Sequence, residues 1–152
     1  MPQRSRLSTT LSGIAGEYFV AAELSRRGYV ASLTLKNSKG IDILASDSNA
    51  TKSVGIQVKT HQGRGKDWIL SQKVETDTAS NLFFVFVRLN ELEAVEYYVV
   101  PREDVSRFAA DRHRKYLQTK GRNGQQRKDS SMRKFSDLEG KYLNRWDLLG
   151  LD

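Results

Sequence analysis

The stretch GIDILASDSNATKSVGIQVKTH, residues 40–61, contains two apolar runs separated by a polar segment. Residues 40–45 and 53–60 have the composition of β-strands, and the polar segment has that of a hairpin loop. Because side chains alternate across a strand, Gln57 and Lys59 share one face of the second strand, and the even-numbered residues share the other. The stretch therefore predicts two paired strands with an amide and an amine side by side.

A carboxylate, Asp42, interrupts the first of these strands, where its neighbours are apolar. Burying an ionised carboxylate without a partner costs several kcal/mol. Taken alone, Asp42 fits a structural ion pair or a strand-edge aspartate. If residues 46–53 close the hairpin, it lies opposite Gln57 or Lys59 at roughly 5 Å, the separation of facing side chains, and Lys59 becomes its partner. A slip of one residue in register would separate these groups.

Residues 12–27 have the pattern of a helix, with Ser12 as the N-cap and Gly28 as the left-handed stop. A second acid, Glu17, lies on the apolar stripe of this helix, because the residues three, four and seven positions later are Val20, Ala21 and Leu24. We therefore expect Glu17 to point inward, toward the strands.

The remainder of the chain alternates apolar and polar segments. Strands are predicted at residues 29–35, at 82–89, which is apolar enough to be buried on both faces, and at 95–100, with 68–70 as a short extension of the sheet. Pro101 suits the first position of a helix that runs to about Gln118. We expect one domain, residues 1–152, with a basic loop and a short helix at about 119–152. The end of this loop overlaps the unusual string KDSSMRKF, residues 128–135, for which we have no physical account.

Composition favours a polyanionic partner. The formal net charge is +7 and the pI is about 9.7, which favours nucleic acid, although a merely basic protein has the same balance. The absence of cysteine excludes disulfides, thiolate catalysis and cysteine-bound zinc. No segment has the length and apolarity of a membrane helix or a signal peptide, so we expect a cytoplasmic protein.

The helix acid, the acid in GIDIL and the string IQVKT resemble the PD-(D/E)XK nucleases, particularly the Holliday-junction-resolvase-like and restriction-endonuclease-like members. The resemblance covers about residues 12–61 and extends weakly through 82–89. It implies an α/β fold with a restriction-endonuclease-like αβββαβ core, in which helices flank a central mixed sheet. It also implies double-stranded DNA as the partner, and a homodimer would suit two strands.

By this resemblance, Asp42 matches the first acid of the motif, Gln57 its (D/E) position, Val58 its X and Lys59 its lysine, while Glu17 matches the additional helix acid. Gln57 departs from the pattern, because it replaces a carboxylate and removes one negative charge. The resemblance implies Mg²⁺, or Mn²⁺, bound by Asp42, the amide oxygen of Gln57 and the backbone carbonyl of Val58, with Glu17 acting through a water or on a second ion. Lys59 would orient or deprotonate the attacking water, or stabilise the scissile phosphate.

Basic and imidazole side chains outside the motif are candidates for phosphate contact, although each alone is more often a plain surface group. They are Lys36, Lys39, His61, Arg64, Lys66, Arg112, Arg114, Lys115, Arg122, Arg127 and Lys128. The sequence thus predicts a metal-dependent endonuclease acting on DNA. A nucleic-acid-binding module that has lost catalysis through Gln57, and a protein-interaction component of an antitoxin or defence system, stay open as alternatives.

Overall fold

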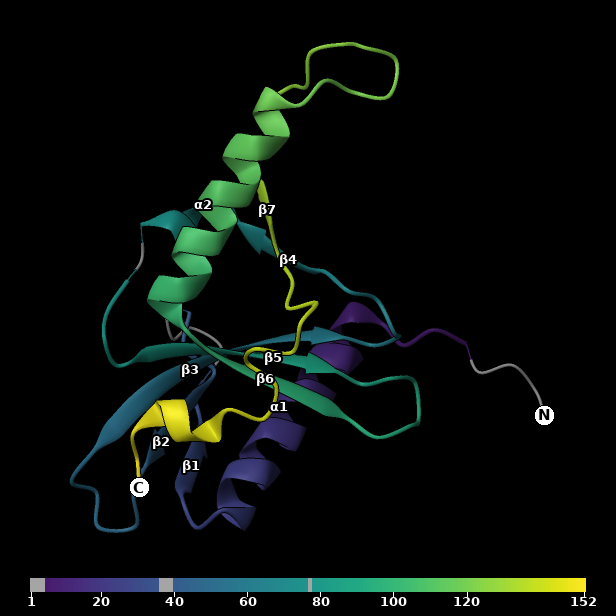
Figure 1. The fold of residues 1–152 in the computed structure, drawn as a ribbon. Helices are drawn as coiled ribbons and strands as arrows, with labels where there is room; N and C mark the ends of the chain where they lie inside the picture. Colours follow the sequence, from purple (N-terminus) through teal and green to yellow (C-terminus); the bar gives the residue numbers. More distant parts are fainter. Residues whose placement is uncertain (1–4, 36–39, 77) are drawn as a thin grey trace.

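The central feature of the computed structural model, which describes residues 5–35, 40–76 and 78–152, is a mixed β-sheet. Its five strands lie in the order β1 (Val30–Leu33), β2 (Ile43–Ser46), β3 (Ser53–His61), β5 (Leu82–Arg88) and β6 (Glu96–Pro101). Neighbours are antiparallel except β3 and β5, which are parallel. The predicted hairpin and the predicted mixed sheet are therefore confirmed (Figure 1).

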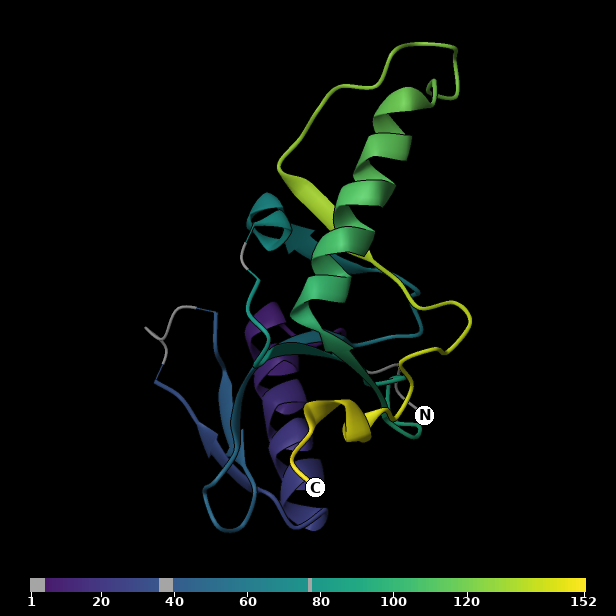
Figure 2. The same cartoon turned by 60° about the vertical axis from the view of Figure 1, so that its left-hand side comes forward.

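Two apolar clusters cover the two faces of this sheet. Helix α1 (Thr9–Arg26) and the 3-10 turn η2 (Trp146–Leu149) pack on the face that contains Ile56 and Val85. Helix α2 (Arg102–Gln118) packs on the face that contains Phe84 and Phe86. The sheet is thus flanked by helices, as predicted, and Figure 2 shows α1 and α2 separated by the sheet.

The connection between the parallel strands β3 and β5 contains β4 (Trp68–Ser71) and a 3-10 turn, η1 (Gln72–Glu75). Strand β4 does not extend the main sheet, as the sequence had indicated. It pairs instead with β7 (Met132–Phe135) in a separate two-stranded ribbon. The physical reason is that Trp68 and Leu70 point to one side of β4 and are buried against the Phe84 and Phe86 face, so the ribbon lies over the sheet.

Strand β7 lies within the string KDSSMRKF, at the end of the segment that the sequence predicted to be a basic loop. Its burial alternates, since Arg133 and Phe135 are buried while Met132 and Lys134 are exposed. The aromatic ring of Phe135 stacks on that of Phe86 with centroids 4.4 Å apart. Between α2 and β7 the chain forms an extended arm that projects from the rest of the molecule (Figure 1).

Three predicted boundaries change. Helix α1 begins three residues earlier than expected, because Ser8 is its N-cap and accepts a hydrogen bond from the Leu11 amide at 3.2 Å. Ser12 lies inside the helix, where its hydroxyl donates to the carbonyl of Thr9. Pro101 is the N-cap of α2 and not its first residue, and the C-terminal helix is a single 3-10 turn.

Within the described residues, neither α-helix has the length and apolarity of a membrane span.

Candidate active site

Asp42 directly precedes β2, at the end of the pairing between β2 and β3. The pairing of the two strands ends at Ile43 opposite Ile56, whereas β3 continues to His61. The Asp42 amide donates to the Ile56 carbonyl at 2.8 Å. The Asp42 carboxylate accepts a hydrogen bond from the backbone amide of Val58, with Oδ2 and N 2.7 Å apart. The half-buried carboxylate is therefore held against the residue between Gln57 and Lys59.

This hydrogen bond differs from the ion pair that the sequence predicted for the Asp42 carboxylate. In the described part of the chain Asp42 forms no ion pair with Lys59, so the predicted partnership between them is wrong. A backbone amide stabilises the carboxylate instead, because β3 has no strand partner at Val58 on that edge. The Lys59 amine is left to line a pocket on a face of β3.

The backbone of β3 places a second oxygen beside Asp42. Odd-numbered residues of β3 bond to the β5 side, since Gly55 N–H donates to Asn81 and the His61 carbonyl accepts from Leu89. The N–H and C=O of one strand residue point to the same edge. The carbonyl of Val58 therefore faces the same edge as its amide, the edge where Asp42 lies.

Gln57 and Lys59 do share a face, as the alternation of β3 predicted. They lie opposite Phe84 and Phe86 in the parallel ladder, and both line one pocket of about 500 Å³. The pocket lies between β3, the β4–η1 connection and the start of α2. Its described lining comprises Gly40, Gln57, Lys59, Leu70, Ser71, Lys73, Val74, Phe84 and Arg102.

Arg102, which sequence reasoning missed, is the first residue of α2 and is 3% exposed. Its guanidinium donates to the side-chain oxygen of Gln57 and, at 3.4 Å, to the carbonyl of Gly40. It also lies 4.8 Å from the centre of the Phe84 ring. The only signal in the sequence was an arginine directly after the apolar strand β6 and its proline, which does not reveal a contact with Gln57.

Glu17 is half-buried and lies on α1 beside the point where this helix crosses β3. The neighbouring Gly16 is buried, and a Cβ added to it would stand 1.8 Å from the Thr60 hydroxyl. Only glycine permits this approach, which fixes α1 next to the end of β3 that carries Lys59. The structure therefore places Glu17 in the neighbourhood of β3, on the side of the sheet covered by α1.

The donor set suits a hard cation only in part. Asp42 and the Val58 carbonyl offer two oxygens at the same edge of β3, which are ligands that Mg²⁺ accepts. The amide oxygen of Gln57 already faces a guanidinium, which disfavours a cation beside it. Among the described residues no group of three or more His, Asp or Glu side chains could hold a metal ion. The sequence-based ligand set therefore stays a prediction, with Asp42 and Val58 as its best supported members.

The predicted phosphate contacts fall into several environments. Lys36 and Lys39 lie outside the described residues. Arg64 and Lys66 are exposed in the loop after β3, whereas His61 accepts a hydrogen bond from the Gly63 amide at 3.1 Å and packs within its own loop.

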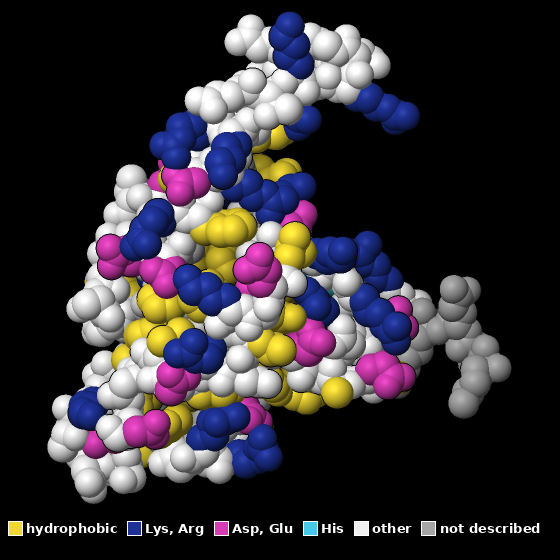
Figure 3. All heavy atoms as spheres, viewed as in Figure 1, with side chains coloured by type: hydrophobic (Ala, Val, Ile, Leu, Met, Phe, Trp, Pro, Cys, Tyr) yellow, Lys and Arg dark blue, Asp and Glu magenta, His cyan; other side chains and the backbone are white. Residues whose placement is uncertain are grey.

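Other members of the set lie along α2 and the arm. Arg112 is paired with Asp67 and Arg114 with Asp111, while Arg127 lies 4.5 Å from the ring of Tyr116. Lys115, Arg122 and Lys128 are exposed. In Figure 3, Lys and Arg side chains gather around a hollow between the arm and the rest of the molecule.

This architecture is the restriction-endonuclease-like fold that the resemblance predicted. The bacterial homing endonuclease I-Ssp6803I is similar, with a TM-score of 0.55 and 16% identity over 95% of this chain and 94% of that chain. The Holliday junction resolvase Hjc of Archaeoglobus fulgidus has a TM-score of 0.48 and 14% identity over 82% and 84% of the two chains. No protein-family model and no curated protein matches the sequence.

Proposed function

We propose that this protein is a metal-dependent endonuclease that cuts DNA. The observation that carries the proposal is the bond between the Asp42 carboxylate and the Val58 amide. It sets an acid from one strand beside the backbone segment that also presents Gln57 and Lys59. The fold shared with a homing endonuclease supports the same class of activity.

Different residues of the chain would bind the metal, act on the attacking water and hold the DNA. Asp42 and the Val58 carbonyl would hold Mg²⁺ or Mn²⁺, with Gln57 and Glu17 as further, weaker or water-mediated donors. When bound, the metal lowers the pKa of a coordinated water and offsets charge on the phosphate. Lys59 would orient or deprotonate the attacking water, or donate to the scissile phosphate. The exposed basic side chains at the hollow would hold the DNA backbone.

A binding module without catalysis is the second candidate. One observation favours it: Gln57 is neutral, and its oxygen is already occupied by the Arg102 guanidinium. In this case DNA would be retained on the basic surface, and the charge of the site would serve recognition alone.

The experiment that separates these candidates uses supercoiled plasmid, branched DNA and RNA, each with Mg²⁺, with Mn²⁺ and with EDTA. We expect the wild-type protein to cut DNA with metal and not with EDTA. Lys59→Ala should abolish cutting and leave binding largely intact. Lys52→Ala is a matched control, because Lys52 lies in the β2–β3 hairpin at the other end of β3 and donates to the Asp152 carbonyl.

Each possible failure has a distinct meaning. Equal cutting by wild type and Lys59→Ala would disprove the catalytic role of Lys59. Salt-sensitive retention on DNA without cutting would establish the binding module. Neither cutting nor retention would disprove both candidates.

A further inference from the structure

The pocket beside Gln57 and Lys59 is lined by basic side chains. Its described lining contains three cationic side chains, Lys59, Lys73 and Arg102, and no Asp or Glu. Its volume of about 500 Å³ falls in the range of small-molecule sites. The two lysine amines in one space repel one another, and a bound anion relieves that repulsion.

Lys73 reaches the pocket because the β3–β5 connection folds back over the sheet. Trp68 and Leu70 anchor β4, and the buried Val74 anchors η1 directly after Lys73. The backbone of η1 is also tied to α2, since the Ser106 hydroxyl donates to the Glu75 carbonyl at 2.9 Å. The backbone at Lys73 is therefore held in place.

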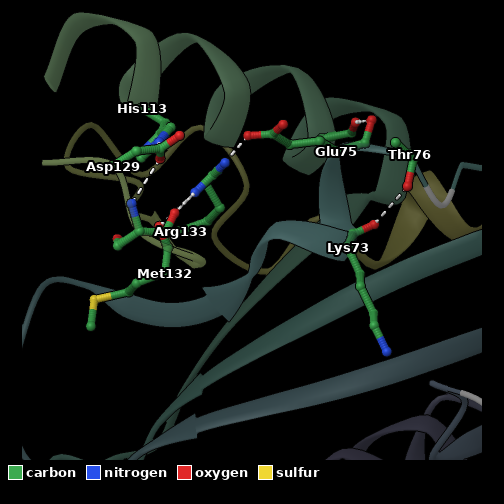
Figure 4. Close-up of polar contacts among 9 residues, drawn as sticks. Lys73, Glu75, Thr76, His113, Asp129, Met132 and Arg133 are labelled. Atoms are coloured by element: carbon green, nitrogen blue, oxygen red, sulfur yellow. Dashed lines mark hydrogen bonds and ion pairs between the residues drawn. The ribbon is translucent and has the colours of Figure 1, made fainter. Parts of the chain in front are cut away.

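The side chain of Lys73 extends from η1 away from α2 and toward the strands of the main sheet (Figure 4). In the same view Glu75 turns the other way, to Arg133 of β7. Within the described residues, neither Lys73 nor Lys59 forms an ion pair with a carboxylate. Both amines are thus available to one ligand in the shared pocket.

We propose that Lys73 is a second lysine of the candidate site, and that Lys59 and Lys73 together bind one phosphate group of a nucleotide without a metal ion. Ser71 and the Gln57 amide supply further polar groups, and the apolar side chains of Leu70, Val74 and Phe84 line a wall against which a sugar or base can pack. The inference deepens the proposed function, on which it rests for the role of Lys59. The role of Lys73 is to bind phosphate.

The test is binding in EDTA at low salt, where no metal-dependent cleavage occurs. Inorganic phosphate, thymidine 5′-monophosphate and thymidine are titrated into the full chain and followed by calorimetry and by NMR shifts. We expect the monophosphate to bind more tightly than phosphate, and thymidine not to bind. Lys73→Ala and Lys59→Ala should each weaken monophosphate binding by roughly tenfold or more, as expected for a lost charge-assisted hydrogen bond.

Three further variants sharpen the result. Lys73→Arg keeps the charge and should retain most of the affinity, Lys73→Glu should abolish binding, and Lys52→Ala should bind like wild type. Because the Lys73 side chain is exposed, we expect these variants to fold, and their melting curves check this.

The outcomes separate this inference from the proposed function. Lysine-dependent nucleotide binding by a protein that cuts no DNA would support the phosphate pocket and disprove the catalysis. Cleavage of DNA by wild type, with nucleotide binding unchanged in Lys73→Ala, would overturn the pocket alone. Absence of monophosphate binding by the wild-type protein would overturn it as well.

Discussion

The guanidinium of Arg102 donates a hydrogen bond to the side-chain oxygen of Gln57. Arg102 is buried against the ring of Phe84 and starts helix α2, whereas Gln57 lies in the middle of β3. The bond therefore joins the start of a helix to the position that, by the predicted resemblance, matches the (D/E) of the nuclease motif. The amide oxygen accepts from Arg102 without adding a negative charge to the site.

The first prediction concerns this bond. Gln57→Leu removes one acceptor of a buried guanidinium, and we expect it to lower the free energy of unfolding by about 1–3 kcal/mol. Gln57→Glu keeps an acceptor and adds a charge opposite to that of Arg102, so at neutral pH it should be at least as stable as the wild type. Urea unfolding at pH 7.5 measures both. Equal stability of the Leu and Glu variants would show that the bond contributes nothing.

A second prediction separates the two roles of Asp42. Asp42→Asn keeps an oxygen for the Val58 amide but loses the charge, so the fold should persist while metal-dependent cleavage falls on the order of hundredfold or more. Asp42→Ala also leaves the amide without its acceptor, which should cost roughly 1–3 kcal/mol of unfolding free energy. Cleavage rates and melting curves test this pair. An Asn variant that cuts at the wild-type rate would exclude Asp42 as a metal ligand.

The third prediction uses two glycines of α1. A Cβ at Gly16 would overlap the Thr60 hydroxyl, so Gly16→Ala must push α1 away from β3, and we expect a loss of about 1–3 kcal/mol in stability. Gly13 has no atom within 4 Å of the same position, and Gly13→Ala should stabilise the helix by up to about 1 kcal/mol. The Gly16 variant should also lose cleavage, because Glu17 moves with the helix. Similar urea midpoints for the two variants would refute the close contact.

The strands of the main sheet and the polar face of β3 were predictable because their signals are local. Alternation over a few residues puts Gln57 and Lys59 on one face whatever the rest of the fold does. The unusual acid in an apolar strand marked Asp42 for the same reason. Its bonding partner was not predictable, because the end of the β2 pairing at Ile43 leaves the Val58 amide open, and the sequence does not show where a pairing ends.

The rest of the site depends on contacts between distant segments. Arg102 meets Gln57 across 45 residues of sequence, and Lys73 joins the pocket only because β4 folds over the sheet. Strand β7 has only four residues and includes a buried arginine, Arg133, which Glu75 neutralises from 58 residues away. Charged residues in a strand give no apolar pattern, so its composition indicated a loop.

The fourth prediction is a pH dependence at the base of the arm. The hydrogen bond from Arg112 holds the pKa of the Asp67 carboxyl below its ordinary value. Because its pKa is lowered in the folded protein, the Asp67 carboxylate contributes stability at pH values above its pKa in the unfolded chain, about 3.9. This contribution is lost as pH falls through the pKa of the folded protein. Asp67→Asn should therefore be less stable than wild type at pH 7, by less than about 1 kcal/mol because both side chains are partly exposed. The difference should shrink as pH falls below the pKa of the unfolded chain and through the lowered pKa of the folded protein; a difference that grew in acid would contradict the ion pair.

The last prediction tests whether β7 holds the arm in place. Phe135 is 1% exposed and touches the rings of Phe86 and Phe108, whereas Met132 on the same strand is 48% exposed. Phe135→Ala should cost about 3–5 kcal/mol in urea unfolding, because it leaves a cavity between the ribbon and the main sheet. Met132→Ala, which empties no buried space, should change stability by about 0.5 kcal/mol or less. If the arm is anchored through β7, the Phe135 variant should also show faster amide exchange in β4. A Phe135 variant as stable as the Met132 variant would mean that β7 does not pack on the sheet.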